Sequence, residues 1–440
     1  MTDTVLLVGG GGREHAIARA IVDDAGSAPA LYACADNLNP GIDRLADGYA
    51  TIDTTDPDEV TTYAAEVGAA VAVVGPEAPL EAGVVDALEN DGVYAFGPRA
   101  EDARIETDKA FQRSFMAEHG IPGCPDFATF DDPEAACAYV DEYDGDLAVK
   151  PTGLTGGKGV RVIGDQVTAE EAKTFIRESE YDSFVLEERL VGEEFTVQAL
   201  VADGHVRVTP AVQDHKRAYE GDEGPNTGGM GSYSAPRLEL PFMREEEYHD
   251  AVAIIQATVG ALSDYRGILY GQFMLTADGV KVVEYNARFG DPEAMNTLPV
   301  MNTPLMDVIE AARDGERLPQ LSFTPQATVC KYAVPSGYPE SPTAGTKLAI
   351  DDDALGDDAL FFASVDERDD GIYTTTSRSF AVVGVADSIA AAEREAERAL
   401  ETVGTDGLDV RHDIGTEELI EARIDHMRTL RGEAGEPDVS

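Results

Sequence analysis

The first hundred residues alternate short, uninterrupted apolar runs with helical stretches. TVLLVGGGG (4–12) leads into REHAIARAIVDD, and the apolar runs LYACAD, AAVAVVG and VYAFGP follow. Strands of a parallel sheet are continuous apolar runs of this kind because helices cover both of its faces. The pattern therefore predicts an N-terminal, doubly wound α/β domain over residues 1–105.

Strand and helix patterns continue through the rest of the chain. Residues 107–119 have apolar side chains at helical spacing, and Gly120-Ile-Pro122 ends that helix. Strands are predicted at LAVKP, GVRVIG, FVLEERL, EFTVQALVAD, ILYGQFMLT and VKVVEYN, and a helix at AVAIIQATVGALSDYR. We expect a central α/β region over 106–325, a small mixed α/β domain over 326–430 and a frayed tail over 431–440.

The charge excludes several classes of partner. The chain carries 84 acidic and 33 basic residues, a net charge of -51. Such a chain is a poor binder of nucleic acid and of anionic membranes, which are bound through clustered Lys and Arg. Because the acids are spread along the whole chain, we interpret them as a solvated surface adapted to a salty, halophilic cytoplasm. Only eight residues are lysines, and four of them lie in the motifs below: Lys109, Lys150, Lys158 and Lys216.

The spacing of the cysteines and the length of the apolar runs indicate the cellular compartment of the protein. The four cysteines are scattered and form no C-x-x-C pair, so neither a zinc site nor a disulfide framework is indicated. The N-terminus does not resemble a signal peptide, and no apolar run approaches membrane-spanning length. We expect a soluble, cytoplasmic protein, and a monomer.

KPTGLTGGKGV (150–160) looks at first like a Walker A loop, but its spacing is wrong. Thr152 stands where the first glycine of that loop belongs, and Gly159 where the magnesium-binding hydroxyl belongs. Lys150 ends one predicted strand, and Lys158 lies in a glycine hairpin before the next. We therefore predict a hairpin that covers a triphosphate through two lysines and free backbone amides.

VGGGGREHA (8–16) places four glycines between a strand and a helix. Bare amides at a helix N-terminus bind phosphate, and Arg13 adds charge. Neither register of the glycines satisfies the dinucleotide fingerprint, so a single phosphate group is preferred over NAD. Glu77, in VGPEAPL (74–80), follows another strand of the same sheet and is predicted to face the same ligand. Tight strand–helix packing and a simple proline-bounded turn remain the alternatives.

VKVVEYNARFGDPE (280–293) is the most informative segment. Alternation along a strand puts Glu284, Asn286 and Arg288 on one face, together with Val282. Carboxylate and amide oxygens suit Mg²⁺, and the arginine would bind a phosphoryl or carboxylate group. Gln272, on the partner strand, offers another oxygen. The alternative is a solvated face with an ion pair between Glu284 and Arg288.

QDHKRAYEGDEGPNTGGMGSYS (213–234) is predicted to be a long polar loop with five glycines. Asp214 would bind the ammonium group of a zwitterionic amino acid, and Lys216 and Arg217 its carboxylate. A disordered surface insert is the alternative.

These segments, in this order, resemble the phosphoribosylamine–glycine ligase family (glycinamide ribonucleotide synthetases) of the ATP-grasp superfamily. The resemblance covers nearly the whole chain to about residue 430. It is carried by GGREHA (11–16), VGPEAPL (74–80), FGP (96–98), DKAF (108–111), KPTGLTGGKGV, EE-x-L with GEE (187–194), QDHKR (213–217), GPNTGGMG (224–231) and RFGDPE (288–293). KPTGLTGGKG departs from the family's usual KADGLAAGKG, and GGGG stands where many members have G-N-G-G. Neither change touches the predicted chemistry.

The resemblance implies an ATP-grasp fold for 106–325, with a lid over about 122–190, and a phosphoribosylamine domain over 1–105. It also implies a reaction in which ATP, glycine and 5-phosphoribosylamine give glycinamide ribonucleotide, ADP and phosphate in purine biosynthesis. ATP would phosphorylate the glycine carboxylate, and the amine of phosphoribosylamine would attack the glycyl phosphate. Such a reaction needs electrostatic stabilisation of the phosphoryl group rather than a nucleophilic side chain.

The resemblance also implies roles for particular residues. The ATP-binding set is Lys109, Lys150, Gly156, Gly157, Lys158, Gly159, Glu187 and Glu194. The ligands of Mg²⁺ or Mn²⁺ are Gln272, Glu284 and Asn286. The catalytic residues are Arg288 and Lys158. Glycine would contact Asp214, Lys216, Asn226, Thr227 and Gly228, and phosphoribosylamine would contact Gly11, Gly12, Arg13 and Glu77.

Three other functions are weighed against this one. Another ATP-grasp ligase, such as a purine-pathway carboxylase or formyltransferase or a biotin carboxylase, lacks QDHKR and GPNTGGMG. An NAD-dependent oxidoreductase requires the fingerprint that is broken at 9–15. A non-catalytic nucleotide sensor would have no reason to keep the predicted metal row, both loop lysines and Arg288 together.

Overall fold

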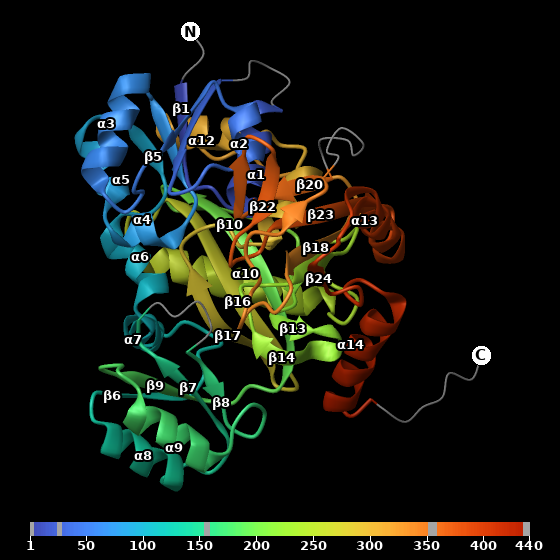
Figure 1. The fold of residues 1–440 in the computed structure, drawn as a ribbon. Helices are drawn as coiled ribbons and strands as arrows, with labels where there is room; N and C mark the ends of the chain where they lie inside the picture. Colours follow the sequence, from blue (N-terminus) through green and yellow to red (C-terminus); the bar gives the residue numbers. More distant parts are fainter. Residues whose placement is uncertain (1–3, 24–28, 154–158, 351–358, 434–440) are drawn as a thin grey trace.

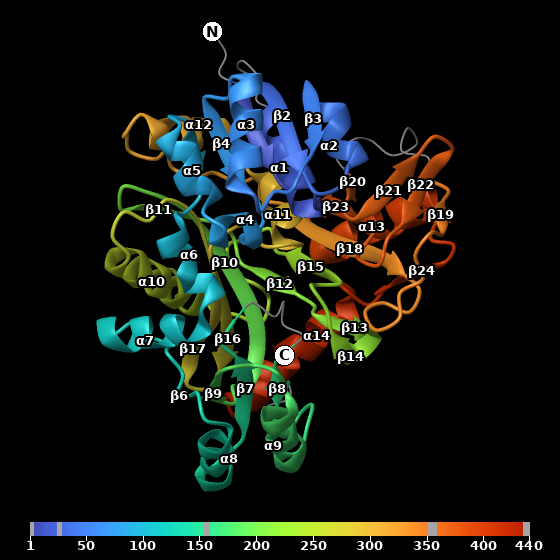
Figure 2. The same cartoon turned by 60° about the vertical axis from the view of Figure 1, so that its left-hand side comes forward.

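The N-terminal region is a parallel sheet covered by helices, as the apolar runs predict. The computed structural model describes residues 4–23, 29–153, 159–350 and 359–433 (Figure 1). The elements of this region are β1 (Thr4–Val8), α1 (Gly12–Val22), β2 (Ala30–Ala35), α2 (Pro40–Leu45), β3 (Gly48–Thr51), α3 (Pro57–Val67), β4 (Val71–Val74), α4 (Glu77–Glu81), α5 (Val84–Asn90) and β5 (Tyr94–Phe96). All neighbouring strands are parallel, in the order β3-β2-β1-β4-β5. Figures 1 and 2 show α1 and α2 on one face and α3 and α5 on the other. The carboxyl ends of β1 and β4 therefore meet at one edge of the sheet, where ligands bind in such folds.

A small antiparallel sheet with its own helices lies at the opposite end of the molecule (Figure 2). It corresponds to the predicted lid, and we use that name for it. The linking helices and the lid elements are α6 (Ala100–Thr107), α7 (Lys109–His119), β6 (Phe127–Phe130), α8 (Pro133–Glu142), β7 (Leu147–Pro151), β8 (Arg161–Val162), α9 (Ala169–Glu178) and β9 (Phe184–Glu188). The sheet order is β6-β9-β7-β8. Buried side chains of α8, α9, β7 and β9 pack among themselves and form a hydrophobic cluster separate from the main core.

The central region supplies most of a long antiparallel sheet. Its elements are β10 (Gly192–Ala202), β11 (His205–Val208), β12 (Val212–Asp214), β13 (Arg217–Tyr219), η1 (Glu220–Asp222), β14 (Glu223–Asn226), β15 (Gly231–Ser234), α10 (Glu245–Ala261), β16 (Gly267–Thr276), β17 (Gly279–Asn286), α11 (Glu293–Thr297), η2 (Leu298–Val300) and α12 (Leu305–Arg313). The polar segment 213–234, predicted to be a loop, contains four short strands instead. Its backbone groups pair within the segment, β12 with β15 and β13 with β14, which glycine-rich polar composition does not signal.

The C-terminal region continues the same sheet. Its elements are β18 (Ala327–Pro335), β19 (Lys347–Leu348), β20 (Leu360–Phe362), β21 (Val365–Arg368), β22 (Gly371–Thr374), β23 (Phe380–Ala386), α13 (Ile389–Val403), β24 (Leu408–Val410) and α14 (Glu417–Leu430). The main path of the sheet is β17-β16-β10-β12-β15-β18-β23-β20. The tail predicted from residue 431 lies outside the described residues from 434 onwards.

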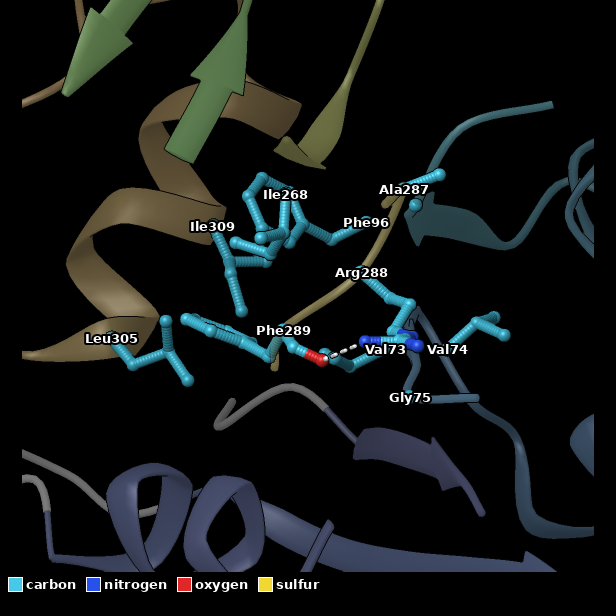
Figure 3. Close-up of a pocket in the computed structure, with 11 residues that line it drawn as sticks. Val73, Val74, Gly75, Phe96, Ile268, Ala287, Arg288, Phe289, Leu305 and Ile309 are labelled. Atoms are coloured by element: carbon cyan, nitrogen blue, oxygen red, sulfur yellow. Dashed lines mark hydrogen bonds between the residues drawn. The ribbon is translucent and has the colours of Figure 1, made fainter. Parts of the chain in front are cut away.

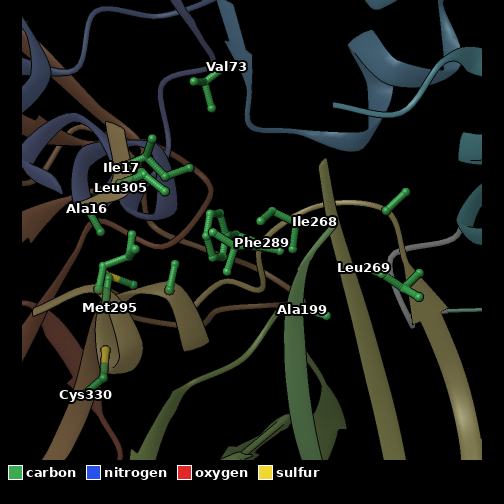
Figure 4. Packing of buried hydrophobic residues seen from close by; sticks show 14 of the residues in the cluster. Ala16, Ile17, Val73, Ala199, Ile268, Leu269, Phe289, Met295, Leu305 and Cys330 are labelled. Atoms are coloured by element: carbon green, nitrogen blue, oxygen red, sulfur yellow. The ribbon is translucent and has the colours of Figure 1, made fainter. Parts of the chain in front are cut away.

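One hydrophobic core joins the N-terminal, central and C-terminal regions. In Figure 4, Ala16 and Ile17 of α1 face Met295 of α11 and Leu305 of α12, and Cys330 of β18 lies beneath them. This packing fixes the glycine turn at the start of α1 against the segment that follows β17. No described helix is long and apolar enough to cross a membrane.

Candidate functional site

A cavity of about 430 Å³ lies between the lid and the central sheet. It collects residues that are far apart in the sequence and that come from the lid, from β10, from β12 and from the β16–β17 hairpin. The predicted site residues that line it are Lys150, Glu187, Glu194, Asp214, Lys216, Asn226, Gln272 and Glu284. Apolar side chains from both sides, including Val162 of the lid and Met274 of β16, complete its walls. A polar floor between apolar walls suits a nucleotide, whose base is flat and apolar and whose phosphates are charged.

Lys150 and Glu187 form a buried ionic group at the lid end of this cavity. Lys150 Nζ donates to Glu187 Oε2 at 2.7 Å and to the carbonyl of Val283 at 3.1 Å. Arg113 of α7, which the sequence reasoning did not single out, donates to both Glu187 oxygens at 2.7 and 2.9 Å. Burial opposes the ionisation of Glu187, but Arg113 and Lys150 hold the pKa of its carboxyl below the usual value. Glu187 therefore stays ionised and orients Lys150 toward the cavity.

The structure describes only part of the hairpin that is predicted to cover phosphates. Lys109 Nζ donates to the carbonyl of Gly153 at 2.9 Å, so α7 holds the start of the hairpin. Burial lowers the pKa of Lys109, whereas the Glu284 carboxylate acts to raise it. Gly159 is buried just before β8. The remaining predicted residues, Gly156, Gly157 and Lys158, lie outside the described residues.

The predicted metal row lies on the β16–β17 hairpin. Gln272 pairs directly with Glu284 across the two strands, and Asn286 pairs with Tyr270. A bulge between these pairs and the next one, Phe273 with Val282, changes the alternation. Val282 consequently packs in the core, and the prediction that it shares the face of Glu284 is wrong. Plain alternation cannot locate such an extra residue.

An ammonium group already lies among the predicted metal ligands. Lys216 Nζ donates to Gln272 Oε1 at 2.6 Å and lies 3.7 Å from Glu284 Oε1. Gln272 Nε2 donates in turn to Glu194 Oε2 at 2.6 Å. Burial opposes the ionisation of Glu284, yet Lys216 and Lys109 lower the pKa of its carboxyl to about 2. This group of oxygens thus suits a cation. In this structure the ammonium group of Lys216, which belongs to the predicted amino acid segment, lies next to it.

The donor set fits Mg²⁺ or Mn²⁺ only when phosphates complete it. Within the described ranges no group of three His, Cys, Asp or Glu side chains is placed to hold a metal. One carboxylate with two amide oxygens is too few for a cage made by protein alone. It matches instead the mode in which Mg²⁺ is bound through one or two protein ligands together with substrate phosphates.

Arg288 lies between two carboxylates of other elements. Its Nε is 3.2 Å from Glu77 Oε2, and its Nη2 is 3.0 Å from Glu106 Oε1. The guanidinium lowers the pKa of the Glu77 carboxyl to about 2. Burial raises the pKa of Glu106 to about 7. Figure 3 shows Arg288 in the lining of a small, mostly apolar cavity, where its Nη1 donates to the carbonyl of Phe289 at 3.3 Å. These contacts join the predicted catalytic arginine to the predicted phosphoribosylamine residue Glu77.

The glycine turn at the start of α1 already holds an anion from its own helix. Gly11 N–H donates to Glu14 Oε2 at 2.7 Å, and Arg13 Nε donates to Glu14 Oε1 at 2.5 Å. Arg13 Nη1 also donates to the carbonyl of Phe289 at 3.1 Å. Gly12 lies against the hydroxyl of Tyr332. Glu14 thus holds the groups that were predicted to bind phosphate, and a ligand that used them would have to displace its carboxylate.

The segment predicted to bind an amino acid lies beside Asp214. The backbone N–H and the hydroxyl of Thr227 donate to the Lys216 carbonyl, at 2.7 and 2.9 Å. Asp214 is enclosed, and its Oδ1 has no hydrogen-bond partner in the part of the chain that the structure describes. Burial raises the pKa of Asp214, and the nearby Glu293 carboxylate adds to this. A carboxylate in this position favours a bound ammonium group.

Three domain models of one protein family match the chain. They are phosphoribosylglycinamide synthetase, N domain, at residues 3–106; its ATP-grasp (A) domain at 107–294; and its C domain at 328–417. The chain belongs to the phosphoribosylglycinamide synthetase family. The order of the three domains in this family agrees with the N-terminal sheet, the cavity region and the C-terminal strands described above.

Full-length relatives of this family are similar along the whole chain. A phosphoribosylamine–glycine ligase of Methanosarcina barkeri is 50% identical over 437 residues, which cover 97% of this chain and 100% of that protein. One from Methanocella arvoryzae is 48% identical over 437 residues, with 97% and 100% coverage. The crystal structure of phosphoribosylamine–glycine ligase from Thermotoga maritima is 25% identical, with a TM-score of 0.78, and covers 93% of this chain and 99% of that one.

More distant structures share the fold of this family. The biotin carboxylase domain of 2-oxoglutarate carboxylase from Hydrogenobacter thermophilus, in complex with magnesium ADP and bicarbonate, has a TM-score of 0.71 at 18% identity. It covers 97% of this chain and 94% of that chain. The likeness concerns the fold alone.

Proposed function

We propose that this chain joins glycine to 5-phosphoribosylamine with ATP, giving glycinamide ribonucleotide, ADP and phosphate in purine biosynthesis. The observation that carries the proposal is 50% identity to a phosphoribosylamine–glycine ligase along its full length. The cavity supports it independently, because acidic, amide and ammonium groups suited to a metal nucleotide line the same space as Asp214. The intermediate proposed is glycyl phosphate, which requires glycine and the transferring phosphoryl group to lie side by side.

We assign the predicted site residues to parts of the substrates according to their charge. Lys109, Lys150 and Lys158 would neutralise the phosphates, with Gly156, Gly157 and Gly159 offering backbone amides, and Glu187 and Glu194 would contact the adenosine part. Glu284, Gln272 and Asn286 would hold Mg²⁺ or Mn²⁺, and the metal supplies positive charge that stabilises the transferring phosphoryl group. Arg288 would stabilise the acyl phosphate. Its contact with Glu77, at 3.2 Å, supports a position next to the proposed phosphoribosylamine residue.

The two substrate assignments implied by the resemblance differ in the contacts that support them. Asp214, Lys216, Asn226, Thr227 and Gly228 are proposed to face glycine. Enclosure of the Asp214 carboxylate supports this. Gly11, Gly12, Arg13 and Glu77 are proposed to face phosphoribosylamine, but Glu14 holds Gly11 and Arg13 in this structure. We therefore place more weight on Glu77 than on the glycine turn.

Measuring ADP release in high-KCl buffer with Mg²⁺ tests the proposal. Glycine alone, freshly made phosphoribosylamine alone, and both together are compared, and glycinamide ribonucleotide is quantified. The proposal requires ADP release to depend on both substrates, with product in equal amount. ADP release with neither substrate, or with bicarbonate or formate in place of glycine, would contradict the substrate assignment.

Gly229→Ala is expected to weaken glycine binding. Gly229 has φ +107°, and a β-carbon there would lie 2.8 Å from Asp214 Oδ1 and 2.8 Å from Pro292 Cδ. The loop must shift, and Asp214 with it, so the KM for glycine should rise by about tenfold or more. Steady-state kinetics at saturating ATP measure this.

Gly204→Ala is the matched control for that substitution. Gly204 also has a positive φ, +71°, but a β-carbon there would meet no atom within 4 Å. Both variants therefore place a β-carbon at a positive φ, and only Gly229→Ala has the collision. An equal rise in KM in the two variants would remove Gly229 from the glycine site.

We further propose the domain division 1–105, 106–325 and 326–430, with a lid over about 122–190. A monomer in a cytoplasm of high salt is proposed on the net charge of -51. At low ionic strength, repulsion among so many carboxylates would destabilise the folded state.

A further inference from the structure

Arg378, in the C-terminal region, contacts two segments of the central region. One is 226–229, which is proposed to bind glycine, and the other contains Asp291 and follows β17. Its Nη1 donates to the carbonyls of Gly228 at 2.7 Å, Gly229 at 3.0 Å and Asp291 at 3.3 Å. Its Nη2 lies 3.3 Å from Asp291 Oδ1. One guanidinium therefore joins two segments that are more than sixty residues apart in the sequence.

The guanidinium of Arg378 is held in place by contacts of its own backbone and by the Tyr332 ring. The carbonyl of Arg378 accepts from Ser364 N–H at 2.9 Å, and the N–H of Ser379 donates to the carbonyl of Ala333 at 3.0 Å. The guanidinium lies 4.3 Å from the centre of the Tyr332 ring, and Tyr332 Oη donates to Asp291 Oδ1 at 2.6 Å. An arginine held by its backbone, by an aromatic face and by a carboxylate is well placed to act as a support.

The backbone is held on either side of Gly228 and Gly229, by Thr227 to the Lys216 carbonyl and by Met230 to the His215 carbonyl. Gly228 and Gly229 carry no side chains that could anchor them, and Gly229 adopts a positive φ that glycine takes readily. The N–H of Gly229 donates to the Thr227 hydroxyl, but the two carbonyls on this side are directed at Arg378. Because the Gly229 backbone passes beside Asp214, its position determines the space next to that carboxylate.

We propose that Arg378 is a positioning residue that holds the 226–229 segment in the shape required by the amino acid substrate. This proposal rests on the proposed function, because the glycine role of that segment does. Its side chain is 14% exposed, and its guanidinium donates to protein groups, so it acts through the loop rather than as a ligand. Arg378 thereby contributes to glycine recognition without itself lining the cavity.

Arg378→Met tests the proposal, because it should change the KM for glycine but not the KM for ATP. Methionine keeps the apolar length but cannot donate to the three carbonyls. The KM for glycine should rise by about tenfold or more, because the free enzyme must order the segment on binding. The KM for ATP should stay within about twofold of its original value. Arg378→Lys should recover part of the loss, since an ammonium can reach some of these carbonyls but lacks the planar fork.

A measurement without substrates separates this proposal from the proposed function. Hydrogen–deuterium exchange at the backbone amides of 227–230 should be faster in Arg378→Met than in the original chain. This readout needs no catalysis, so it decides whether Arg378 holds the segment even if the chain proves to join other substrates.

Arg368→Met is the matched control. Arg368 also stacks on a tyrosine, with 4.1 Å between its guanidinium and the ring centre of Tyr373, but its side chain is exposed. It should leave glycine kinetics and loop exchange unchanged. Unchanged exchange and unchanged glycine KM in Arg378→Met would overturn the proposal. A rise confined to the KM for phosphoribosylamine would also overturn it, because Arg378 would then be a ligand of that substrate.

Discussion

Glu284→Gln should reduce turnover by about a thousandfold, because a metal supplies several kcal/mol of charge stabilisation and each tenfold costs about 1.4 kcal/mol. Glu284 is the one carboxylate in the proposed metal row, and its pKa of about 2 keeps it ionised at every working pH. Glutamine keeps its size but removes the negative charge that a divalent ion needs. Turnover is measured against free Mg²⁺ and Mn²⁺ concentration, and excess metal should not restore it.

The fold of that variant should survive, because no hydrophobic contact is lost. Circular dichroism and the unfolding midpoint check this. Asp278→Asn is the control, since Asp278 lies exposed at the tip of the same β16–β17 hairpin. Retained activity of Glu284→Gln at ordinary Mg²⁺ would contradict the metal assignment.

Arg113→Met should lower the free energy of unfolding by about 3–5 kcal/mol, the usual cost of removing one partner from a buried ion pair. Arg113 is 1% exposed and binds both oxygens of Glu187. It also donates to the carbonyls of Val282 at 3.1 Å and Val283 at 2.7 Å. The Val282 carbonyl would lose this donor, whereas the Val283 carbonyl keeps Lys150. Denaturant unfolding in high-KCl buffer measures the loss.

The same substitution should change how stability depends on pH. The folded-state pKa of Glu187 is below its ordinary value, so the carboxylate contributes stability above its unfolded pKa. That contribution is lost as pH falls through the folded pKa. Without Arg113 the folded pKa rises, and acid unfolding should begin at a higher pH.

Arg177→Met is a matched control for this prediction. Arg177 also binds both oxygens of a glutamate, Glu134, at 2.8 and 3.1 Å, but on the exposed surface of the lid. Solvent screens such a pair, so its loss should leave the unfolding midpoint unchanged. Equal losses in Arg113→Met and Arg177→Met would show that burial is not the cause.

The sequence predicts the regular parts of this fold because their signals are local. Apolar runs identify β1, β2, β4 and β5, and the dipeptide Asp278-Gly279, a strong hairpin-turn signal, identifies β16 with β17. It does not predict that β18 extends the central sheet by pairing with β15, since the partners are about a hundred residues apart. Nor does it find the strands within 213–234, whose pairing overrides a turn-like composition.

Motifs predict which residue types gather at the cavity, but not their contacts. Lys150, Glu187, Lys216, Gln272 and Glu284 do come together there. The groups that hold them were missed because they lie outside the recognised motifs or carry no spacing signal. Arg113 had one signal that could have found it, a charged residue beside Phe115 and Met116 on the apolar side of α7. Arg378 had none.

The lid has a core of its own, and this has an evolutionary consequence. Its buried side chains, such as Val149 and Leu186, pack only among themselves and with partly buried lid residues. The described contacts toward the rest of the chain include polar seams, such as Arg113 with Glu187 and the Val282 N–H with the carbonyl of Gly123. Substitutions in well-separated, independently packed groups have additive effects. The core of the lid can therefore change in sequence independently of the main core, whereas the polar contacts that join the lid to the rest of the chain must be kept.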